Sequence, residues 1–244
     1  MAATAVPLCA ASTLGLADVL AALGPALLPY LAVQDPWSLA DTLQSLVVFP
    51  LLAGSAIVGS FKLRGDVESR WRSTVPESEF FASLYVSRGI FHIFVQLMEK
   101  VPVSHLLLMT LHHILSVVAI GESLLTKQMQ FFACLNGVCE MSTIFLNNLY
   151  LSKEITVGGK ELKDLLPSWL IAANGIGLWL SFLLFRLCLF PCWLYLMYTD
   201  VANFPAATWD KASLVERYMY PAVNVFLLCL STFWFISITK GMLK

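Results

Sequence analysis

The sequence predicts an all-α, polytopic membrane protein with about six to seven transmembrane helices. Of its 244 residues, 58% are hydrophobic and only 13% are charged, whereas in a soluble domain about a quarter of the residues are charged. The apolar residues also form runs of about 20 residues, the length at which a helix spans a bilayer. The formal net charge of −1 gives no indication of a nucleic-acid partner.

Seven apolar runs, bounded by charged residues, Pro or Gly, are the expected spans. The first is the weakest because Asp18, Pro25 and Pro29 interrupt it, and a re-entrant or interfacial segment is its alternative. The sixth is too long for one straight helix, so we expect a kink at Pro191 or two segments that meet there. The runs cover residues 14–33, 42–61, 80–98, 104–121, 128–151, 168–199 and 218–240.

Two polar loops separate these runs, and no repeat divides the chain. Residues 1–41 form an N-terminal segment with the expected first span, and residues 42–244 form one membrane domain. Residues 62–79 are the most charged loop, and residues 152–167 contain a Gly pair. Lys and Arg divide almost evenly between the two sides, so orientation is left open. The six cysteines lie in apolar surroundings without a CxxC pair, and we interpret them as packing residues.

The fifth run contains a carboxylate, Glu140, in the middle of an apolar stretch. A charge at the bilayer centre costs about 2.5–3.5 kcal/mol on insertion scales, so such a side chain faces the bundle interior or a wet cavity. Asn136, Thr143 and Asn147 fall with Glu140 within about 60° of one helical face. This face predicts either an interior hydrogen-bonding seam or the wall of a functional site.

The third run carries a second polar face, about 80° wide. Buried polar groups without partners cost several kcal/mol in hydrocarbon, so the polar faces are expected to converge on a common interior. Arg186, in the sixth run, is a candidate for the same interior and a partner for Glu140 or Glu99. The members of the third-run face are Tyr85, Arg88, His92, Gln96 and Glu99.

The fourth run carries adjacent histidines, His112 and His113, and the first of them shares a face with His105 and Ser116. Imidazole titrates near neutrality, so the pair fits general acid–base or nucleophilic catalysis. Hydrogen bonding between helices, for example to Thr143, is the competing interpretation. Both interpretations stay open on the residues alone.

Metal binding and transport are weaker hypotheses. Histidine-box membrane enzymes need many histidines, and this chain has four in all. A site made of His112, Glu140 and a third ligand remains conceivable, but we expect no metal. Transporters also place ionisable groups at mid-membrane, yet the paired repeats typical of their folds are not visible here.

The order of these motifs resembles the TLC-domain family, which includes the ceramide synthases and the translocation-associated TRAM proteins. Ceramide synthases carry an HD..D pattern in the span after the histidines, whereas this chain has NGVCEMS, with Glu140 and no aspartate pair. The closer resemblance is therefore to the smaller TLC-domain-containing proteins. The segments that carry it, within about residues 42–240, are SRGIFH, LHHILSVV, EMSTIFLNNLYL, FLLFRLCLFPCWLYL and PAVNVFLLCLSTFWFISITKG.

The resemblance implies a helical bundle around a central, lipid-accessible cavity, with residues 42–244 as the TLC-like domain. It implies a role in lipid metabolism or homeostasis, with acyl-CoA-dependent acyl transfer to a lipid amine or hydroxyl as the candidate reaction. His112 and His113 are then the expected catalytic pair, with Glu140 orienting the base. The expected substrate-binding residues are Arg88, His92, Asn136, Thr143, Asn147 and Arg186.

The alternative function is a non-enzymatic protein that binds lipid, regulates membrane composition or traffics cargo with the same cavity. Whether the chain is an enzyme is left open at this point. The expected partners are membrane lipids, with acyl-CoA as a candidate co-substrate and no other cofactor. The endoplasmic reticulum is the expected membrane, and the plasma membrane is the alternative.

Overall fold

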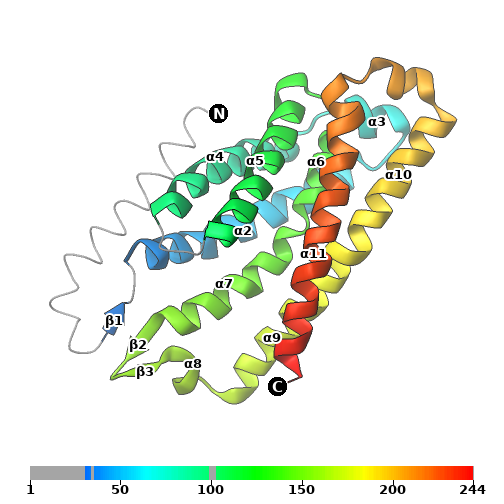
Figure 1. Ribbon diagram of the computed structural model, residues 1–244. Helices are drawn as coiled ribbons and strands as arrows, with labels where there is room; N and C mark the ends of the chain where they lie inside the picture. The colour runs from blue at the N-terminus through cyan, green and yellow to red at the C-terminus, as the bar shows by residue number, and fades with distance from the viewer. Residues whose placement is uncertain (1–30, 34–35, 99–102, 244) are drawn as a thin grey trace.

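The computed structural model describes residues 31–33, 36–98 and 103–243, and it is helical apart from one short sheet (Figure 1). Within this part of the chain, five helical segments are long and apolar enough to cross a membrane. They confirm the all-α, polytopic fold class, and they correspond to the second, third, fourth, sixth and seventh expected spans. The segments are Asp41–Leu63, Val67–Leu97, Leu106–Thr126, Ser168–Asn203 and Val215–Met242.

Three of these spans are α2 (Pro36–Leu63), α4 (Pro76–Met98) and α5 (Val103–Thr126). Each extends beyond its expected bounds, and α2 begins six residues before the run at 42. The charged loop between α2 and α4 contains a short helix, α3 (Val67–Arg72). Its N-cap is Asp66, whose side chain accepts a hydrogen bond from the Ser69 backbone N–H at 2.8 Å. That hydrogen bond lowers the pKa of the Asp66 carboxyl.

The fifth run is broken into two helices, α6 (Gln130–Gly137) and α7 (Glu140–Glu154). The expected single helix over 128–151 is therefore wrong in this detail. A Cβ at Gly137 would lie 2.2 Å from the Phe81 ring, so only glycine allows this close approach of α6 to α4. The break puts Glu140 in the first turn of α7, where the helix dipole favours a carboxylate.

The sixth run is one continuous helical segment made of α9 (Ser168–Phe182), the π-helix η1 (Leu183–Cys188) and α10 (Leu189–Asn203) (Figure 1). The irregularity lies one turn before Pro191, the residue at which we expected a kink. Proline has no N–H to donate to the preceding turn, so the hydrogen-bond register changes there. The Leu189 N–H bonds to the Leu184 carbonyl, five residues back.

The chain returns through two 3₁₀ turns, η2 (Pro205–Ala207) and η3 (Trp209–Lys211). A second π-helix, η4 (Val215–Met219), leads directly into the last span, α11 (Tyr220–Met242). This arrangement matches the expected seventh span but starts three residues earlier.

A small antiparallel sheet lies at the end of the molecule where α7 ends (Figure 1). Its strands, in the order β1 (Leu31–Val33), β2 (Ile155–Val157) and β3 (Lys160–Glu161), are followed by the one-turn helix α8 (Leu162–Leu165). Gly158 and Gly159 both have positive φ, as a two-residue hairpin turn requires. The last three residues of the expected first span are thus strand, and residues 14–30 lie outside the described part.

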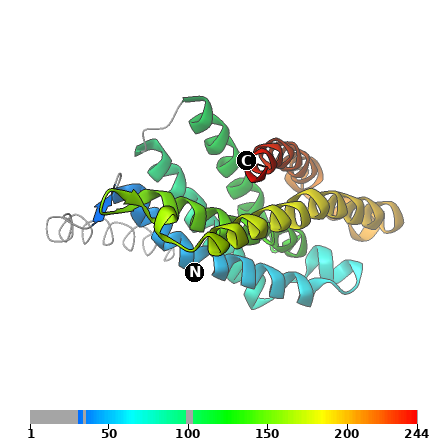
Figure 2. The ribbon, with the colours of Figure 1, turned by 90° about the horizontal axis from the view of Figure 1, so that it is seen from below.

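The helices pack around α2, which contacts α4, α6 and α7. In the view from below, α2 and α11 lie on opposite sides of the molecule, with α9 and α10 running between them (Figure 2). One apolar core lies between α2, α4 and α6 around Leu52, Phe81 and Cys134. A second core lies between α3, α6 and α10, where Phe132 packs edge-on against Trp71 and Trp193.

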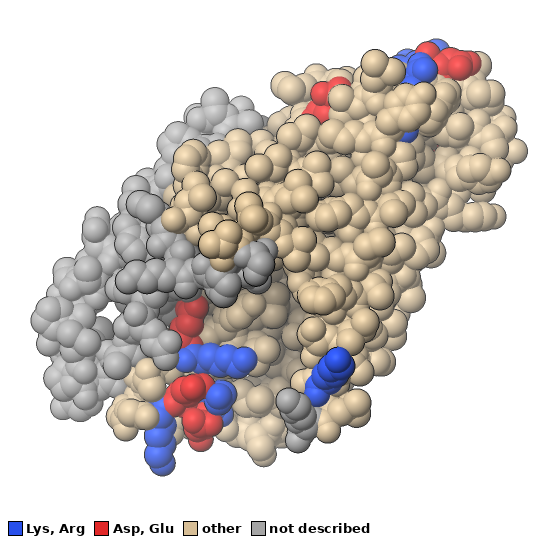
Figure 3. All heavy atoms as spheres, in the orientation of Figure 1, with Lys and Arg blue, Asp and Glu red and all other residues tan. Residues whose placement is uncertain are grey.

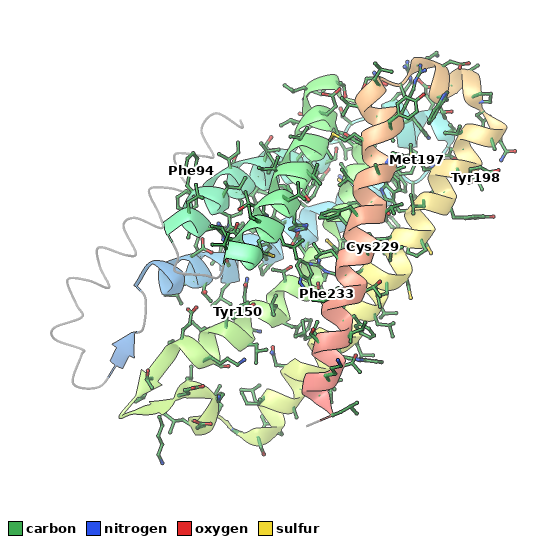
Figure 4. All side chains as sticks on the ribbon, in the orientation of Figure 1. Phe94, Tyr150, Met197, Tyr198, Cys229 and Phe233 are labelled. Carbon is green, nitrogen blue, oxygen red and sulfur yellow. The ribbon has the colours of Figure 1, made fainter. Side chains whose placement is uncertain are left out.

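Charged side chains gather at the two ends of the molecule and leave an apolar band between them (Figure 3). Large apolar side chains in that band point outward: Phe94, Tyr198 and Phe233 are exposed, whereas Met197 is buried (Figure 4). This distribution is the one expected of a protein whose middle faces lipid.

The cysteines divide between the core and the surface. Within the described residues all are free: Cys134 and Cys139 are buried, whereas Cys188, Cys192 and Cys229 are exposed. Our interpretation of the cysteines as packing residues therefore holds for the first two and is wrong for the other three. Cys9 lies outside the described residues.

Candidate functional site

A small cavity lies inside the bundle, where α4, α5, α6, α7, η1, α10 and α11 meet. Its volume is about 30 Å³, enough for one or two water molecules but far smaller than an acyl chain. A lipid therefore enters only if side chains around the cavity move. Its polar lining residues are Tyr85, His112, Ser116, Asn136, Glu140 and Arg186, which come from three of the predicted polar faces and from the sixth run.

Glu140 and Arg186 are both 7% exposed and are joined through a hydroxyl group. Arg186 Nη2 donates to Thr143 Oγ1 at 3.2 Å, and that hydroxyl donates to Glu140 Oε2 at 2.8 Å. Arg186 Nε also donates to Ser142 Oγ at 2.8 Å. The expected partnership of Arg186 with Glu140 is thus present in bridged form. We call these four residues the Glu140–Arg186 network.

The local folding of two helices produces this network. Ser142 and Thr143 lie within one turn of Glu140 in α7, so their hydroxyls reach the same neighbour. The π-helix η1 carries Arg186, whose guanidinium also lies 4.8 Å from the centre of the Phe182 ring. A planar guanidinium with several donors is well suited to hold two hydroxyls at once.

Three histidine rings form a chain that leads to the cavity, and we call them the histidine cluster. The ring centres of His92 and His113 are 4.7 Å apart, and those of His113 and His112 are 4.9 Å apart. Trp234 of α11 lies against His112 at 5.9 Å. His112 Nδ1 and His113 Nε2 are buried and have no hydrogen-bond partner among the described residues. Of the two residues, His112 lines the cavity and His113 does not.

Arg88 and His92 are held by a residue that we did not predict, Asp41 of α2. Arg88 Nη2 donates to Asp41 Oδ2 at 2.8 Å and to Ser45 Oγ at 3.0 Å. His92 Nδ1 lies 3.3 Å from the same carboxylate oxygen. Asp41 was missed because it lies one residue before the expected second span. Pro36 five residues earlier, a residue favoured in the first turn of a helix, was the signal for a longer helix.

The remaining predicted residues occupy different places. Asn136 lines the cavity, and its Oδ1 accepts a hydrogen bond at 2.9 Å from Asn224 of α11, a second residue that we did not predict. Asn147 is buried on α7 but does not line the cavity. Glu99 and the His105 side chain lie outside the described part. The described hydrogen bonds of Glu140 lead to Thr143 and Cys139 and not to a histidine.

No metal site is evident in the described part of the chain, where no three His, Cys, Asp or Glu side chains are grouped to hold an ion. The functional groups of the site are therefore imidazole, carboxylate, guanidinium and hydroxyl. Together they can accept and donate protons and stabilise a negative charge in a space shielded from bulk water.

Comparison of the sequence with known protein families identifies the family to which the chain belongs. The family model for the TLC domain matches residues 37–240. A search of curated proteins and a search of solved structures each gave no match. The matched segment contains the histidine cluster, the Glu140–Arg186 network and Asp41, and it covers most of the chain. The chain therefore belongs to the TLC-domain family, which suggests a membrane protein of lipid metabolism or homeostasis.

Proposed function

We propose that this protein transfers an acyl group from acyl-CoA to a lipid amine or hydroxyl within the membrane. The observation that supports this proposal is the pair of adjacent imidazoles, His112 and His113, of which His112 lines a cavity together with a carboxylate and a guanidinium. Each imidazole keeps one buried ring nitrogen without a partner among the described residues. A nitrogen without a partner can act as a base or as a nucleophile.

His112 is the proposed base because it lines the cavity directly. Its ring nitrogen takes the proton from the acceptor N–H or O–H as that group attacks the thioester carbonyl carbon. The C–S bond then breaks, and the departing thiolate of CoA recovers the proton from the imidazolium. If His112 instead carries the acyl group, its nitrogen attacks the thioester first, CoA leaves as a thiolate, and the acceptor attacks the acyl-imidazole. His113 would shuttle the proton.

Arg186 is the proposed site for negative charge. It lines the cavity, and its described hydrogen bonds lead to hydroxyls, so no carboxylate neutralises it directly. Arg88 is less suited to this role because Asp41 already neutralises it. A guanidinium in a site that excludes water stabilises a developing oxyanion or an anionic headgroup far better than one in bulk water.

The test uses purified protein in nanodiscs with labelled long-chain acyl-CoA and a panel of lipid amines and alcohols, with products identified by mass spectrometry. We expect His112→Gln to lower the product at least about 100-fold, the usual minimum for loss of an acid–base group. His105→Gln, on the same helix, is the control and should retain activity. Product formation at the wild-type rate in His112→Gln would exclude His112 as the base or acyl carrier.

A non-enzymatic lipid-binding function is the second candidate. The observation that favours it is that the Glu140–Arg186 network is internally hydrogen-bonded, as a purely structural network would be. Here Glu140→Gln would lower thermal stability, and the same lipid would co-purify with wild type and His112→Gln. Unchanged stability of Glu140→Gln would count against this function.

We place the protein in the membrane of the endoplasmic reticulum, where acyl-CoA and lipid acceptors meet, with the plasma membrane as the alternative. The support is the family membership together with the five apolar helices. Fluorescence microscopy of the tagged full chain beside markers for both membranes tests this placement.

A further inference from the structure

We propose that Asp41 is a positioning residue for the histidine pair, and that it acts through His92. This inference deepens the proposed function, since it concerns the pair that would carry the reaction. It follows from a series of contacts that leads from α2 through α4 to α5. Asp41 and His92 do not line the cavity, so their role is one of orientation and not of chemistry.

Asp41 and Arg88 form the fixed end of this arrangement. They are 6% and 3% exposed, and their ion pair joins Asp41 Oδ2 to Arg88 Nη2 at 2.8 Å. The two charges cancel, so the pair can sit inside an apolar bundle where a single charge would be costly. The same Oδ2 atom lies 3.3 Å from His92 Nδ1. Breaking the ion pair would therefore also free the imidazole.

The contacts of His92 determine which of its nitrogens carries the proton. Asp41 Oδ2 lies 3.3 Å from His92 Nδ1 as a charge contact, without the geometry of a hydrogen bond. A carboxylate oxygen repels an imidazole lone pair at this distance, so a neutral His92 is favoured with its proton on Nδ1. On the other side of the ring, His92 Nε2 lies 3.2 Å from the Gln96 side-chain amide nitrogen. An amide NH₂ can only donate, and it matches an unprotonated Nε2. Asp41 and Gln96 therefore fix the same tautomer and the same ring orientation.

The orientation of the His92 ring in turn constrains the ring of His113. Their rings meet edge to face, with centres 4.7 Å apart and planes at 77°. His113 in turn packs against His112 at 4.9 Å and 61°. Because the two rings are in contact, a fixed His92 ring limits the side-chain rotamers that His113 can adopt. The direction of the free His113 Nε2 atom thus depends on Asp41, although the two residues are on different helices.

The expected kinetic consequence is a loss of rate and not of binding. A misplacement of about 1 Å in a reacting group can cost about 100-fold in rate. Asp41→Asn should therefore lower kcat about 10- to 100-fold and leave KM for acyl-CoA within about two-fold, because Asp41 does not line the cavity.

The decisive experiment reads the histidines directly by NMR. The chain has only four histidines, so ¹⁵N-histidine labelling of the full chain in nanodiscs gives few signals, which single substitutions assign. Imidazole ¹⁵N shifts distinguish the two tautomers. We expect His92 to be protonated on Nδ1 in the wild type, and the signals of His92 and His113 to change in Asp41→Asn.

Asp200→Asn is the matched control. Asp200 is also a buried carboxylate paired with an arginine, since Arg70 Nη2 lies 2.5 Å from its Oδ1, but its pair lies at the opposite end of α2. Asp200→Asn should lower thermal stability without changing the histidine signals. If Asp41→Asn does not fold, Gln96→Met tests the same point, because it removes the donor to His92 Nε2 and leaves the ion pair intact.

Two results would overturn the inference. One is a wild-type His92 protonated on Nε2. The other is unchanged His92 and His113 signals in the folded variants Asp41→Asn or Gln96→Met. The shifts are independent of turnover. If the signals change as expected but wild type acylates no acceptor, the positioning role stands and the proposed acyl transfer is the part that fails.

Discussion

Single residues show how this protein buries charged side chains. Arg88 is paired with Asp41, Arg70 with Asp200, and Arg186 is connected to Glu140 through the Thr143 hydroxyl. A lone buried charge costs several kcal/mol, so each arginine needs a nearby acceptor. In the first two pairs the partner is a carboxylate in direct contact. Only the third pair leaves a guanidinium whose described bonds are to neutral groups.

Arg186→Lys tests whether the shape of the guanidinium matters as well as its charge. Lysine keeps the charge but cannot present the planar fork that reaches Ser142 and Thr143 together. We expect this change to cost about 1.5–3 kcal/mol, the range for a hydrogen bond to a charged group. The midpoint of thermal unfolding in nanodiscs is the measurement.

Ser142→Ala is the companion variant, because it removes one hydrogen bond and no charge. Interhelical hydrogen bonds in membranes average about 0.6 kcal/mol, so its effect should be the smaller of the two. In the double variant the two effects should not add, since both remove the same contact. Fully additive effects would show that Arg186 does not bond to Ser142.

At the level of helices, two irregular segments position the site. The turn between α6 and α7 sets Glu140 at a helix start, and the π-helix before Pro191 carries Arg186. Neither break is evident in the hydropathy of the sequence, because both lie inside apolar runs. Gly137, which packs closely against Phe81, ends α6 at the first break, and Pro191, which has no N–H, follows the second.

Gly137→Ala should destabilise the bundle. Its Cβ would lie 2.2 Å from the Phe81 ring, which is fully buried between α2, α4 and α6 and has little room to move. Overpacking of this kind costs about 1–3 kcal/mol. Gly54→Ala is the control, because a Cβ at Gly54 would have nothing within 4 Å, and alanine in a helix is favoured by about 0.5–1 kcal/mol. Equal melting temperatures for the two variants would contradict the predicted contact.

Asp66→Ala should loosen the first turn of α3. The Asp66 carboxylate accepts from the Ser69 N–H, and this bond holds the carboxyl pKa below its usual value. The bond therefore stabilises α3 above the unfolded-state pKa and is lost as the pH falls through the lower, folded-state pKa. Faster amide exchange at Ser69 in the variant at neutral pH is the expected result. Unchanged exchange would show that the cap is not formed.

On the face shown in Figure 3, the exposed charged side chains lie at the two ends of the molecule, with an apolar band between them. Three ion pairs lie on the surface of the described part of the chain: Lys62 with Glu77, Lys127 with Glu79, and Lys163 with Glu161. Exposed pairs of this kind contribute about 0–1 kcal/mol each. They therefore add only a little to the stability of the helix ends and do not determine the fold.

Salt should consequently have little effect on stability. Raising NaCl from about 0.1 M to about 1 M shortens the Debye length from about 10 Å to about 3 Å and screens the three exposed pairs. We expect the free energy of unfolding in nanodiscs to fall by less than about 2 kcal/mol, because the buried pairs are shielded. A larger fall would indicate that water and ions reach the Arg88–Asp41 and Arg70–Asp200 pairs.

Much of the candidate site was predictable from the helical spacing of polar residues in the sequence. Glu140, Asn136, His112 and Arg186 were expected to share an interior, and all four line one cavity. Asn147 shares the predicted face of Glu140 on α7 but does not line the cavity, because it lies about 10 Å farther along the helix than Glu140. Asp41 was missed because it lies one residue before the expected second span, and Asn224 because we assigned no polar face to the seventh run.

The sequence by itself determined the class of molecule: apolar runs of bilayer length force helices, since backbone groups in hydrocarbon must bond within their own segment. It also determined which faces turn inward, since polar groups avoid lipid. The tertiary structure decided the partners. The packing of helices that are distant in the sequence decides whether Arg88 contacts Glu140 or Asp41. It also decides whether Arg186 contacts a carboxylate or a hydroxyl. The spacing of residues within a single helix carries no information about this packing.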